Sequence, residues 1–328
     1  MIRSSAPARA GIVGNPTDGY GGSVLSVSLG VRATVEITRA ETTRLAVGDH
    51  VAIVRDRSDL ALVGDHTDVA RAVLQRLPEA LECGPFHLRA TTEIPMRAGL
   101  SGSTAILVAI LGGVLRLIGR ELTRYEIAEL AREIEFDGMK IVCGFQDQYM
   151  TVFGGLNYLD FRDKEPTAGG ARVYATVEPL AGVAPLPPLL LANTGVQRHS
   201  GGVHRPLRER WLEGEAAVVR GYERIARLAR EAKVALLAGD WQRLGAIMDE
   251  NHAIQRDLGG SGEANERLIA AARAAGALGA KLAGAGHGGT IIALHENPDE
   301  LAQALTEAGA ARILRVTPGE GLVVEGSL

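Results

Sequence analysis

Cysteine is scarce in this chain of 328 residues, which contains two, Cys83 and Cys143. They form no CxxC pair and no disulfide framework, which argues against a thiol-redox motif and against a disulfide-stapled secreted scaffold. The eight histidines include no HExxH or other zinc-ligand spacing. We therefore expect two reduced thiols and no zinc centre.

Long apolar runs and an excess of basic charge are also missing. The most apolar stretch, Ala105 to Leu115, is too short to span a bilayer, and the first residues, MIRSSAPARAGIVG, lack the apolar core of a signal peptide. The formal net charge of -4 does not give the basic field of a general nucleic-acid binder, although it leaves room for a small cationic pocket. These features predict a cytoplasmic protein that binds neither membranes nor nucleic acids.

The remaining composition is that of a globular protein, with 46% hydrophobic and 23% charged residues, and the length suggests two domains. Alternation and turn residues predict strands in RAGIVG, SVLSVSLGVRATVEITRA, FHLRATTEIP, LNYLDF, GTIIALHE and ARILRVTP, and near Val173 and Leu189. Helical spacing is found in HTDVARAVLQRLPEAL, RYEIAELAREIEFDG, DQYMTVF and NPDELAQALTEAG, in the apolar run that ends near Gly119, and from about Val203 to Leu278. This mixed order favours an α+β fold, and the polar RDKEPTAGGAR predicts a boundary between domains at 1–170 and 171–328.

A loop rich in glycine and hydroxyl groups precedes the apolar helix in MRAGLSGSTAILVAILGGVL. It is not the common P-loop, because no lysine follows its glycines. Free N–H groups at a helix N-terminus nevertheless favour an anion, and Ser103 or Thr104 has an oxygen to offer Mg²⁺. The alternative is a simple helix cap made by Ser101 or Ser103. The residues alone leave both interpretations open.

A second glycine-rich loop, KLAGAGHGGTIIAL, matches GxGxxG through Gly284, Gly286 and Gly289. A dinucleotide-binding fingerprint needs a strand before its glycines and a helix after them, whereas here the predicted helix comes first. A Rossmann site is therefore not expected. So many glycines indicate tight packing or close approach of a ligand.

Two further segments carry polar side chains suited to a hydroxyl-rich or anionic ligand. In PARAGIVGNPTDGYGG, Arg9 lies on the predicted strand, and Asn15 and Asp18 lie in the turn after it, where ordinary turn chemistry is the alternative. In HSGGVHRPLRERW, arginines and histidines surround Ser200, Gly201 and Gly202; they are suited to a carboxylate or phosphate, or are simply solvated.

Three carboxylates on predicted helices are candidates for chemistry. Glu135 lies nearer the apolar stripe of its helix than Glu133, which joins Glu126 and Glu129 on the face expected to be solvated. A buried carboxylate needs a partner, either Mg²⁺ or an arginine. Asp147 begins a short helix and is either a stabilising first-turn charge or a base for a substrate hydroxyl.

Taken in order, PARAGIVGNPTDGYGG, PMRAGLSGSTA and KLAGAGHGGTIIAL resemble the three motifs of the galactokinase, homoserine kinase, mevalonate kinase and phosphomevalonate kinase (GHMP) superfamily. The second motif reads GLSGST where the family loop usually reads GLGSSA. The resemblance implies an N-terminal domain like ribosomal protein S5 and a ferredoxin-like C-terminal domain. It also implies an ATP- and Mg²⁺-dependent kinase for a small molecule, either a monomer or a homodimer.

The resemblance also implies roles for individual residues. Asp147 would accept the proton of the attacking hydroxyl, with Arg9 beside it, and Ser103 and Glu135 would hold Mg²⁺. The residues expected around the ATP phosphates are Pro95, Arg97, Ala98, Gly99, Leu100, Ser101, Gly102, Ser103, Thr104, Gly284, Gly286 and Gly288. Those expected at the sugar are Arg9, Asn15, Asp18, Tyr20, Asp147, Ser200 and Gly201.

Within the superfamily, GNPTDGYGG, GFQDQYMTVFGGLNYLDF and RPLRERWLEG are most similar to glucuronokinases, which implies phosphorylation of the anomeric hydroxyl of D-glucuronate. Heptose 7-phosphate kinases share the EIE and QDQY features, so a kinase for a heptose phosphate or for another small alcohol is the alternative. An alternative of another class is a sensor that binds ATP and sugar without catalysis.

Overall fold

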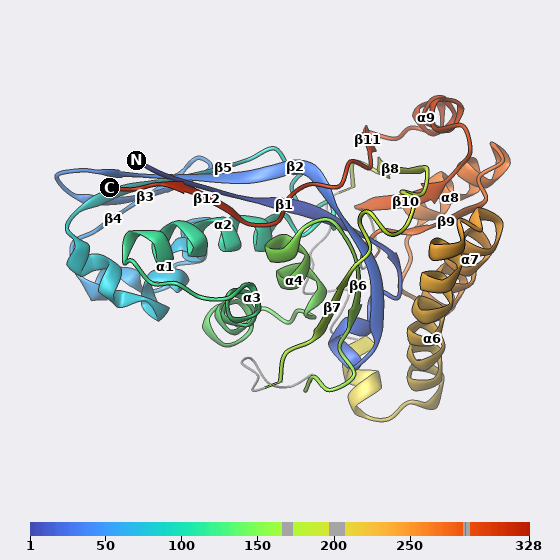
Figure 1. Cartoon of the computed structure of the whole chain (residues 1–328), viewed down its shortest axis with the longest axis horizontal. Helices are drawn as coiled ribbons and strands as arrows, with labels where there is room; N and C mark the ends of the chain where they lie inside the picture. The colour runs from blue at the N-terminus through green and yellow to red at the C-terminus, as the bar shows by residue number, and fades with distance from the viewer. Residues whose placement is uncertain (166–172, 197–206, 285, 287–288) are drawn as a thin grey trace.

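The computed structural model describes residues 1–165, 173–196, 207–284, 286 and 289–328, which form two sheets and the helices around them (Figure 1). The strands of the large sheet are β1 Ile2–Val13, β2 Ser23–Arg39, β3 Thr43–Val47, β4 His50–Val54, β5 Phe86–Thr92, β6 Leu156–Asp160, β7 Thr176–Pro179 and β12 Val323–Gly326. Those of the small sheet are β8 Leu189–Asn193, β9 Gly279–Leu282, β10 Thr290–Leu294 and β11 Arg312–Arg315. The α-helices in the described residues include α1 Asp68–Arg76, α2 Gly102–Leu117, α3 Arg124–Glu133, α4 Gln146–Phe153, α6 Ala216–Ala238, α7 Trp241–Asp257, α8 Glu263–Ala274 and α9 Pro298–Glu307.

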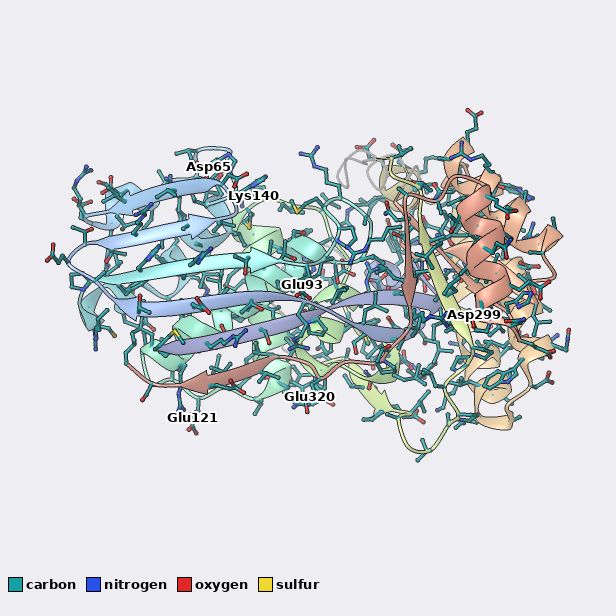
Figure 2. The ribbon with its side chains drawn as sticks, turned by 90° about the horizontal axis from the view of Figure 1, so that it is seen from above. Asp65, Glu93, Glu121, Lys140, Asp299 and Glu320 are labelled. Atoms are coloured by element: carbon teal, nitrogen blue, oxygen red, sulfur yellow. The ribbon has the colours of Figure 1, made fainter. Side chains whose placement is uncertain are left out.

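The large sheet is organised around the long strand β2. Its first half pairs with β6, its second half pairs with β5, and β1 runs antiparallel beside it. The register of β1 against β2 shifts between Pro7 and Arg9, and again between Gly11 and Val13. Because such irregularities change the direction of side chains, they favour a site at this end of β1. Helices α1 to α4 cover one face of this sheet. Figure 2 views the sheet from its other face, so its strands lie in front of these helices.

Helix α2 is the buried helix beneath the large sheet, and it directs its N-terminus toward the interior. It packs on β1 and β2, and its apolar residues Ala105 to Leu115 are mostly fully buried. Glycines at the contact allow the close approach: a Cβ at Gly113 would lie 2.9 Å from the hydroxyl of Ser4. The apolar run that the sequence presents is therefore a core helix.

The small sheet confirms the ferredoxin-like expectation. Its order is β11-β8-β10-β9, and neighbouring strands in this order are antiparallel. Along the chain, helices separate β8 from β9, and α9 separates β10 from β11, which is the βαββαβ arrangement. Helices α8 and α9 pack against this sheet, α7 packs on β9, and α6 packs on α7 and on β2 of the large sheet.

Several local expectations are confirmed and some are corrected. The helix expected in RYEIAELAREIEFDG is present as α3, and a capping box of Thr123 and Glu126 begins it. Strands β3, β4 and β12 were not predicted, and β7 and β12, from the range 171–328, pair with the large sheet. The domain division at 170 stays a prediction. None of the described helices combines the length and apolarity needed to cross a bilayer.

Glu129 corrects the expected solvated face of α3. Its side chain is buried, lies 2.7 Å from the ammonium of Lys164, and accepts a hydrogen bond from the hydroxyl of Tyr149. Periodicity locates one apolar stripe, but α3 is covered on a second side by α4 and by the residues that follow β6.

Candidate active site

Arg9 lies at the meeting point of the three loops that the sequence singles out. Its guanidinium donates to Asp147, with Nε 2.6 Å from Oδ1, and to the carbonyl of Gly99 at 2.8 Å. A longer contact of 3.4 Å reaches the carbonyl of Ala283. Arg9 is 6% exposed, so these bonds are made away from bulk water and fix its position. One side chain thus joins the first motif to both glycine loops and to α4.

Three carbonyl groups of the loop before α2 are held by residues from elsewhere in the chain. Thr290 Oγ1 donates to the carbonyl of Ala98 at 2.9 Å, and the backbone N–H of Arg9 donates to that of Leu100 at 3.2 Å. With the Arg9 bond to Gly99, three consecutive carbonyls are held. Because N–H and C=O point in opposite directions in a trans peptide, the N–H groups that follow them face the other side. This arrangement is suited to an anion.

Ser101 decides against the simple capping alternative for this loop. It lies in the left-handed region with φ 57°, makes no side-chain cap to α2, and donates its hydroxyl to the carbonyl of Leu100 at 2.7 Å. Arg97 has φ 52° and Gly99 has φ 75°, so the loop turns through three left-handed residues before the helix begins. The first turn of α2 contains no acidic residue of its own.

The second glycine loop packs directly on the first. A Cβ at Gly284 would lie 2.6 Å from the carbonyl oxygen of Gly99, so no other residue fits without moving backbone. The carbonyl of Gly284 accepts from Asn15 Nδ2 at 3.1 Å, and that of Ala283 accepts from the N–H of Gly11 at 3.1 Å. Tight packing of three loops is therefore one reason for these glycines.

Glu135 is the buried one of the two neighbouring carboxylates, as its place nearer the apolar stripe predicts. It is 3% exposed and accepts from the hydroxyl of Thr104 at 2.8 Å and from the amide of Gln148. Glu133 instead pairs with Arg76 at 2.8 Å near the surface. Burial raises the pKa of Glu135 to about 7, against the lowering effect of its two hydrogen bonds.

The oxygens of Glu135 and Thr104 are of the type that binds Mg²⁺. Carboxylate and hydroxyl oxygens suit this ion, and a nearby cation would favour the charged form of a buried carboxylate. Thr104, rather than Ser103, contacts Glu135, while Ser103 is exposed in the first turn of α2. The described residues contain no cluster of three His, Cys, Asp or Glu suited to a metal, so other ligands would have to come from phosphate or water.

Asp147 and Asp18 lie close to each other but have different environments. Both contacts of Arg9 reach Oδ1 of Asp147, and Oδ2 has no hydrogen-bond partner among the described residues. The side chain of Asp147 is 29% exposed. Asp18 is buried and accepts from the N–H groups of Phe145 and Gln146, at 2.8 and 2.9 Å, where α4 begins. Burial raises the pKa of Asp18, and the neighbouring Asp147 adds to this.

Two buried residues of the site were missed from the sequence. Gln148 holds Glu135, and Lys281 donates to Asn15 Oδ1 at 2.8 Å and to the carbonyl of Leu282. Burial lowers the pKa of Lys281 well below its ordinary value, with a further contribution from Arg9. Both belong to segments that the sequence highlights, QDQY and KLAGAG, but residue type alone does not distinguish a structural from a functional position.

The remaining predicted residues are less central or cannot be placed. Tyr20 packs between the rings of Trp211 and Tyr222, with ring centroids 5.0 and 4.7 Å away. Arg97 is exposed, and Pro95 and Gly102 are partly exposed. The predictions for Ser200, Gly201 and Gly288 fall outside the described residues.

Two family models match the chain. The model of the GHMP kinases N terminal domain covers residues 66–155, and that of the GHMP kinases C terminal covers residues 232–312. The first range contains the loop before α2 together with Glu135 and Asp147, and the second contains the glycine loop at 284.

Similar proteins of known name extend over most of the chain. Glucuronokinase 1 of Arabidopsis thaliana is 29% identical over 317 residues, which is 90% of this chain and 85% of that protein. A mevalonate kinase of Pyrococcus furiosus is 26% identical and covers 99% of this chain and 98% of its own. The structure of a D-glycero-D-manno-heptose 1-phosphate kinase from Bacteriodes thetaiotaomicron is 22% identical, with a TM-score of 0.75 over the whole of both chains, which shows a common fold.

Proposed function

The chain belongs to the GHMP kinase family and is an ATP-dependent small-molecule kinase, and from that premise we propose that its substrate is D-glucuronate. The reaction transfers the γ-phosphoryl group of ATP to the anomeric hydroxyl and gives glucuronate 1-phosphate and ADP. The observation that carries the choice of sugar is the similarity to Glucuronokinase 1 along 90% of the chain.

In this proposal Asp147 is the base. The anomeric oxygen forms a bond to the γ-phosphorus, the bond from that phosphorus to the β–γ bridging oxygen breaks, and Oδ2 of Asp147 takes the hydroxyl proton. Arg9 holds Oδ1 at 2.6 Å, which orients the free oxygen. The same guanidinium is fixed by the carbonyl of Gly99, so the base and the phosphate loop keep one geometry.

The loop before α2 binds the phosphates in this proposal. Its N–H groups lie opposite three held carbonyls, and the dipole of α2 adds to their effect on negative charge. Mg²⁺, held by Glu135 and a hydroxyl of Ser103 or Thr104, supplies charge neutralisation for the transferred group. Asn15 and Asp18, with Tyr20 beside them, orient the sugar.

A mevalonate-like alcohol is the second candidate for the acceptor. It is favoured by one observation: the mevalonate kinase match covers 99% of the chain, against 90% for the glucuronokinase. The proposed machinery serves either acceptor, because it acts on a hydroxyl and a phosphoryl group.

The test is ADP release with Mg²⁺-ATP and a panel of glucuronate, galacturonate, glucose, galactose, a heptose 7-phosphate and mevalonate. We expect the highest kcat/KM with glucuronate. Preference for mevalonate or a heptose phosphate would overturn the substrate and keep the kinase. Binding of ATP and glucuronate by calorimetry without ADP release would favour the non-catalytic sensor instead.

A further inference from the structure

The last turn of α3 carries a buried arginine without a hydrogen bond. Arg132 is 0% exposed, and its Nε, Nη1 and Nη2 find no acceptor among the residues that the structure describes. Its guanidinium lies 4.0 Å from the centroid of the Phe136 ring and 4.8 Å from that of Phe145. A buried charge in this state is costly unless something pairs with it.

The two rings do not remove this cost. Cation–π contact stabilises the guanidinium through the ring faces, but its five N–H donors lie in its own plane and need acceptors there. Neither of the nearby carboxylates pairs with it: Glu135 accepts from Thr104 and Gln148, and Asp18 accepts through Oδ2 from the start of α4. The donor edge of Arg132 thus has no acceptor among the described residues.

Arg132 lies beside the proposed sugar site. Burial lowers its pKa, and so does the positive charge of Arg208, whereas Cys143, Glu135 and Asp18 oppose this effect. Arg208 lies 5.9 Å from the same Phe136 ring, and it opposes the burial that raises the pKa of Tyr20 to about 12. Two guanidinium groups therefore share one aromatic ring next to the turn that carries Asp18.

Two aromatic side chains lie against the guanidinium of Arg132. Phe136, whose ring centroid is 4.0 Å away, is partly exposed. Phe145, at 4.8 Å, is the residue immediately before α4, and the first turn of that helix contains Asp147.

We propose that Arg132 binds the carboxylate of the sugar-acid substrate and is the residue that distinguishes a uronate from the neutral sugar. The inference rests on the proposed function. An arginine offers two parallel N–H groups to a carboxylate, and a site built for this pairing rejects a neutral sugar because its own charge then stays unpaired. Arg208 adds positive charge on the other side of Phe136.

The experiment compares Arg132→Met, Arg132→Lys and the control Arg124→Met, an exposed arginine on the same helix. Glucuronate and glucose are the two probes, measured by kcat/KM and by sugar-induced thermal shift without ATP. We expect Arg132→Met to lower kcat/KM for glucuronate by about 10²-fold or more and to abolish the thermal shift, with glucose unchanged. Arg132→Lys restores part of the loss, because it keeps the charge but not the bidentate geometry.

The melting temperature without sugar separates this role from a structural one. If Arg132 has no partner in the protein, replacing its buried charge by methionine leaves the melting temperature unchanged or raises it. A structural role predicts a lower melting temperature, or equal losses with both sugars, and either result would overturn the inference.

The inference and the proposed function fail in different ways. If Arg132→Met uses glucuronate as well as the wild type does, the inference is wrong and the proposed function stands. If the wild type prefers a sugar phosphate and Arg132→Met loses binding of it but not of the unphosphorylated sugar, the glucuronate assignment is wrong, and the anion contact of Arg132 stands with a phosphate as the occupant.

Discussion

At the scale of single residues, the chemistry depends on which oxygen of a carboxylate is already used. Asp147 has one oxygen held by Arg9 and one without a partner in the described chain, whereas Asp18 is tied to the backbone at the start of α4. A base needs a free oxygen, so Asp147 is suited to accept a proton and Asp18 to fix α4 and the sugar.

Asp147→Asn removes the charge and the basic oxygen with little change of shape. We expect kcat to fall by roughly 10²- to 10⁴-fold, the usual contribution of a general base, while ATP affinity measured by calorimetry stays near that of the wild type. Asp137→Asn, an exposed carboxylate nearby in sequence, is the matched control and keeps full activity. Full activity in Asp147→Asn would remove this role.

Thr104 provides a second test at this scale, because its hydroxyl orients Glu135 from 2.8 Å. Loss of a group that orients a metal ligand typically costs 10- to 100-fold in metal affinity. Thr104→Val should therefore raise the Mg²⁺ concentration needed for half-maximal activity by about 10-fold or more. Thr104→Ser keeps the hydroxyl and should stay near the wild type. An unchanged Mg²⁺ dependence in Thr104→Val would argue that Glu135 is not at the ion.

At the scale of elements, the site is a junction between the N-terminus of α2 and the two loops packed against it. The positive end of a buried helix is brought to Arg9 on β1 and to Gly284 after β9. The position of Arg9 follows the register shift of β1, and that of α2 follows from its apolar surface beneath the sheet. The phosphate loop therefore depends on contacts made by elements distant in sequence.

Gly284→Ala tests this junction. Its Cβ would lie 2.6 Å from the Gly99 carbonyl, so the two loops must separate. We expect a rise in the KM for ATP of about 10-fold and a loss of roughly 1–3 kcal/mol in the free energy of unfolding, measured in urea. Gly138→Ala is the control, because nothing lies within 4 Å of the added carbon. Equal effects in the two variants would show that the close contact of the loops is not important.

At the scale of the whole molecule, the two sheets are joined by buried hydrogen bonds to the first motif. Asn251 of α7 accepts from the N–H of Gly14 at 2.8 Å, and Lys281 of β9 donates to Asn15 at 2.8 Å. The fully buried Lys281 connects the small sheet to β1 and to the turn after β1, because its ammonium also lies 3.5 Å from the carbonyl oxygen of Gly11. These bonds hold the proposed sugar turn from the C-terminal side.

The lowered pKa of Lys281 makes stability depend on pH. The unfolded chain, with an ordinary lysine pKa of about 10.4, binds this proton more strongly than the folded chain, so the free energy of unfolding rises with pH between the folded and unfolded values. The free energy of unfolding of the wild type, measured in urea, should therefore rise relative to that of Lys281→Met from pH 7 to pH 10, by at most about 1.4 kcal/mol per pH unit. The control is Lys140→Asn, at the exposed lysine labelled in Figure 2. Asparagine is chosen because the backbone of Lys140 has φ 57°, a left-handed conformation that asparagine tolerates. A constant difference would mean that Lys281 stays protonated in the folded protein.

Much of the local structure was predictable, because it depends on neighbouring residues. The capping box of Thr123 and Glu126, the burial of α2 and the preference for Glu135 over Glu133 all follow from spacing along one helix. Strands β3, β4 and β12 did not follow in this way, since short strands are stabilised mainly by their partners. The burial of Glu129 has the same cause, a second packing surface that the period of its own helix does not show.

The sequence by itself determined the family, through three loops in a fixed order, and the residue types available for phosphate, metal and proton transfer. Only the tertiary structure decided which of them meet: that Arg9 contacts Asp147 and Gly99, that Thr104 lies at Glu135, and that Arg132 is buried without a partner. The physical reason is that loop composition is a local property of the chain, whereas desolvation and hydrogen-bond pairing depend on residues brought together from across it.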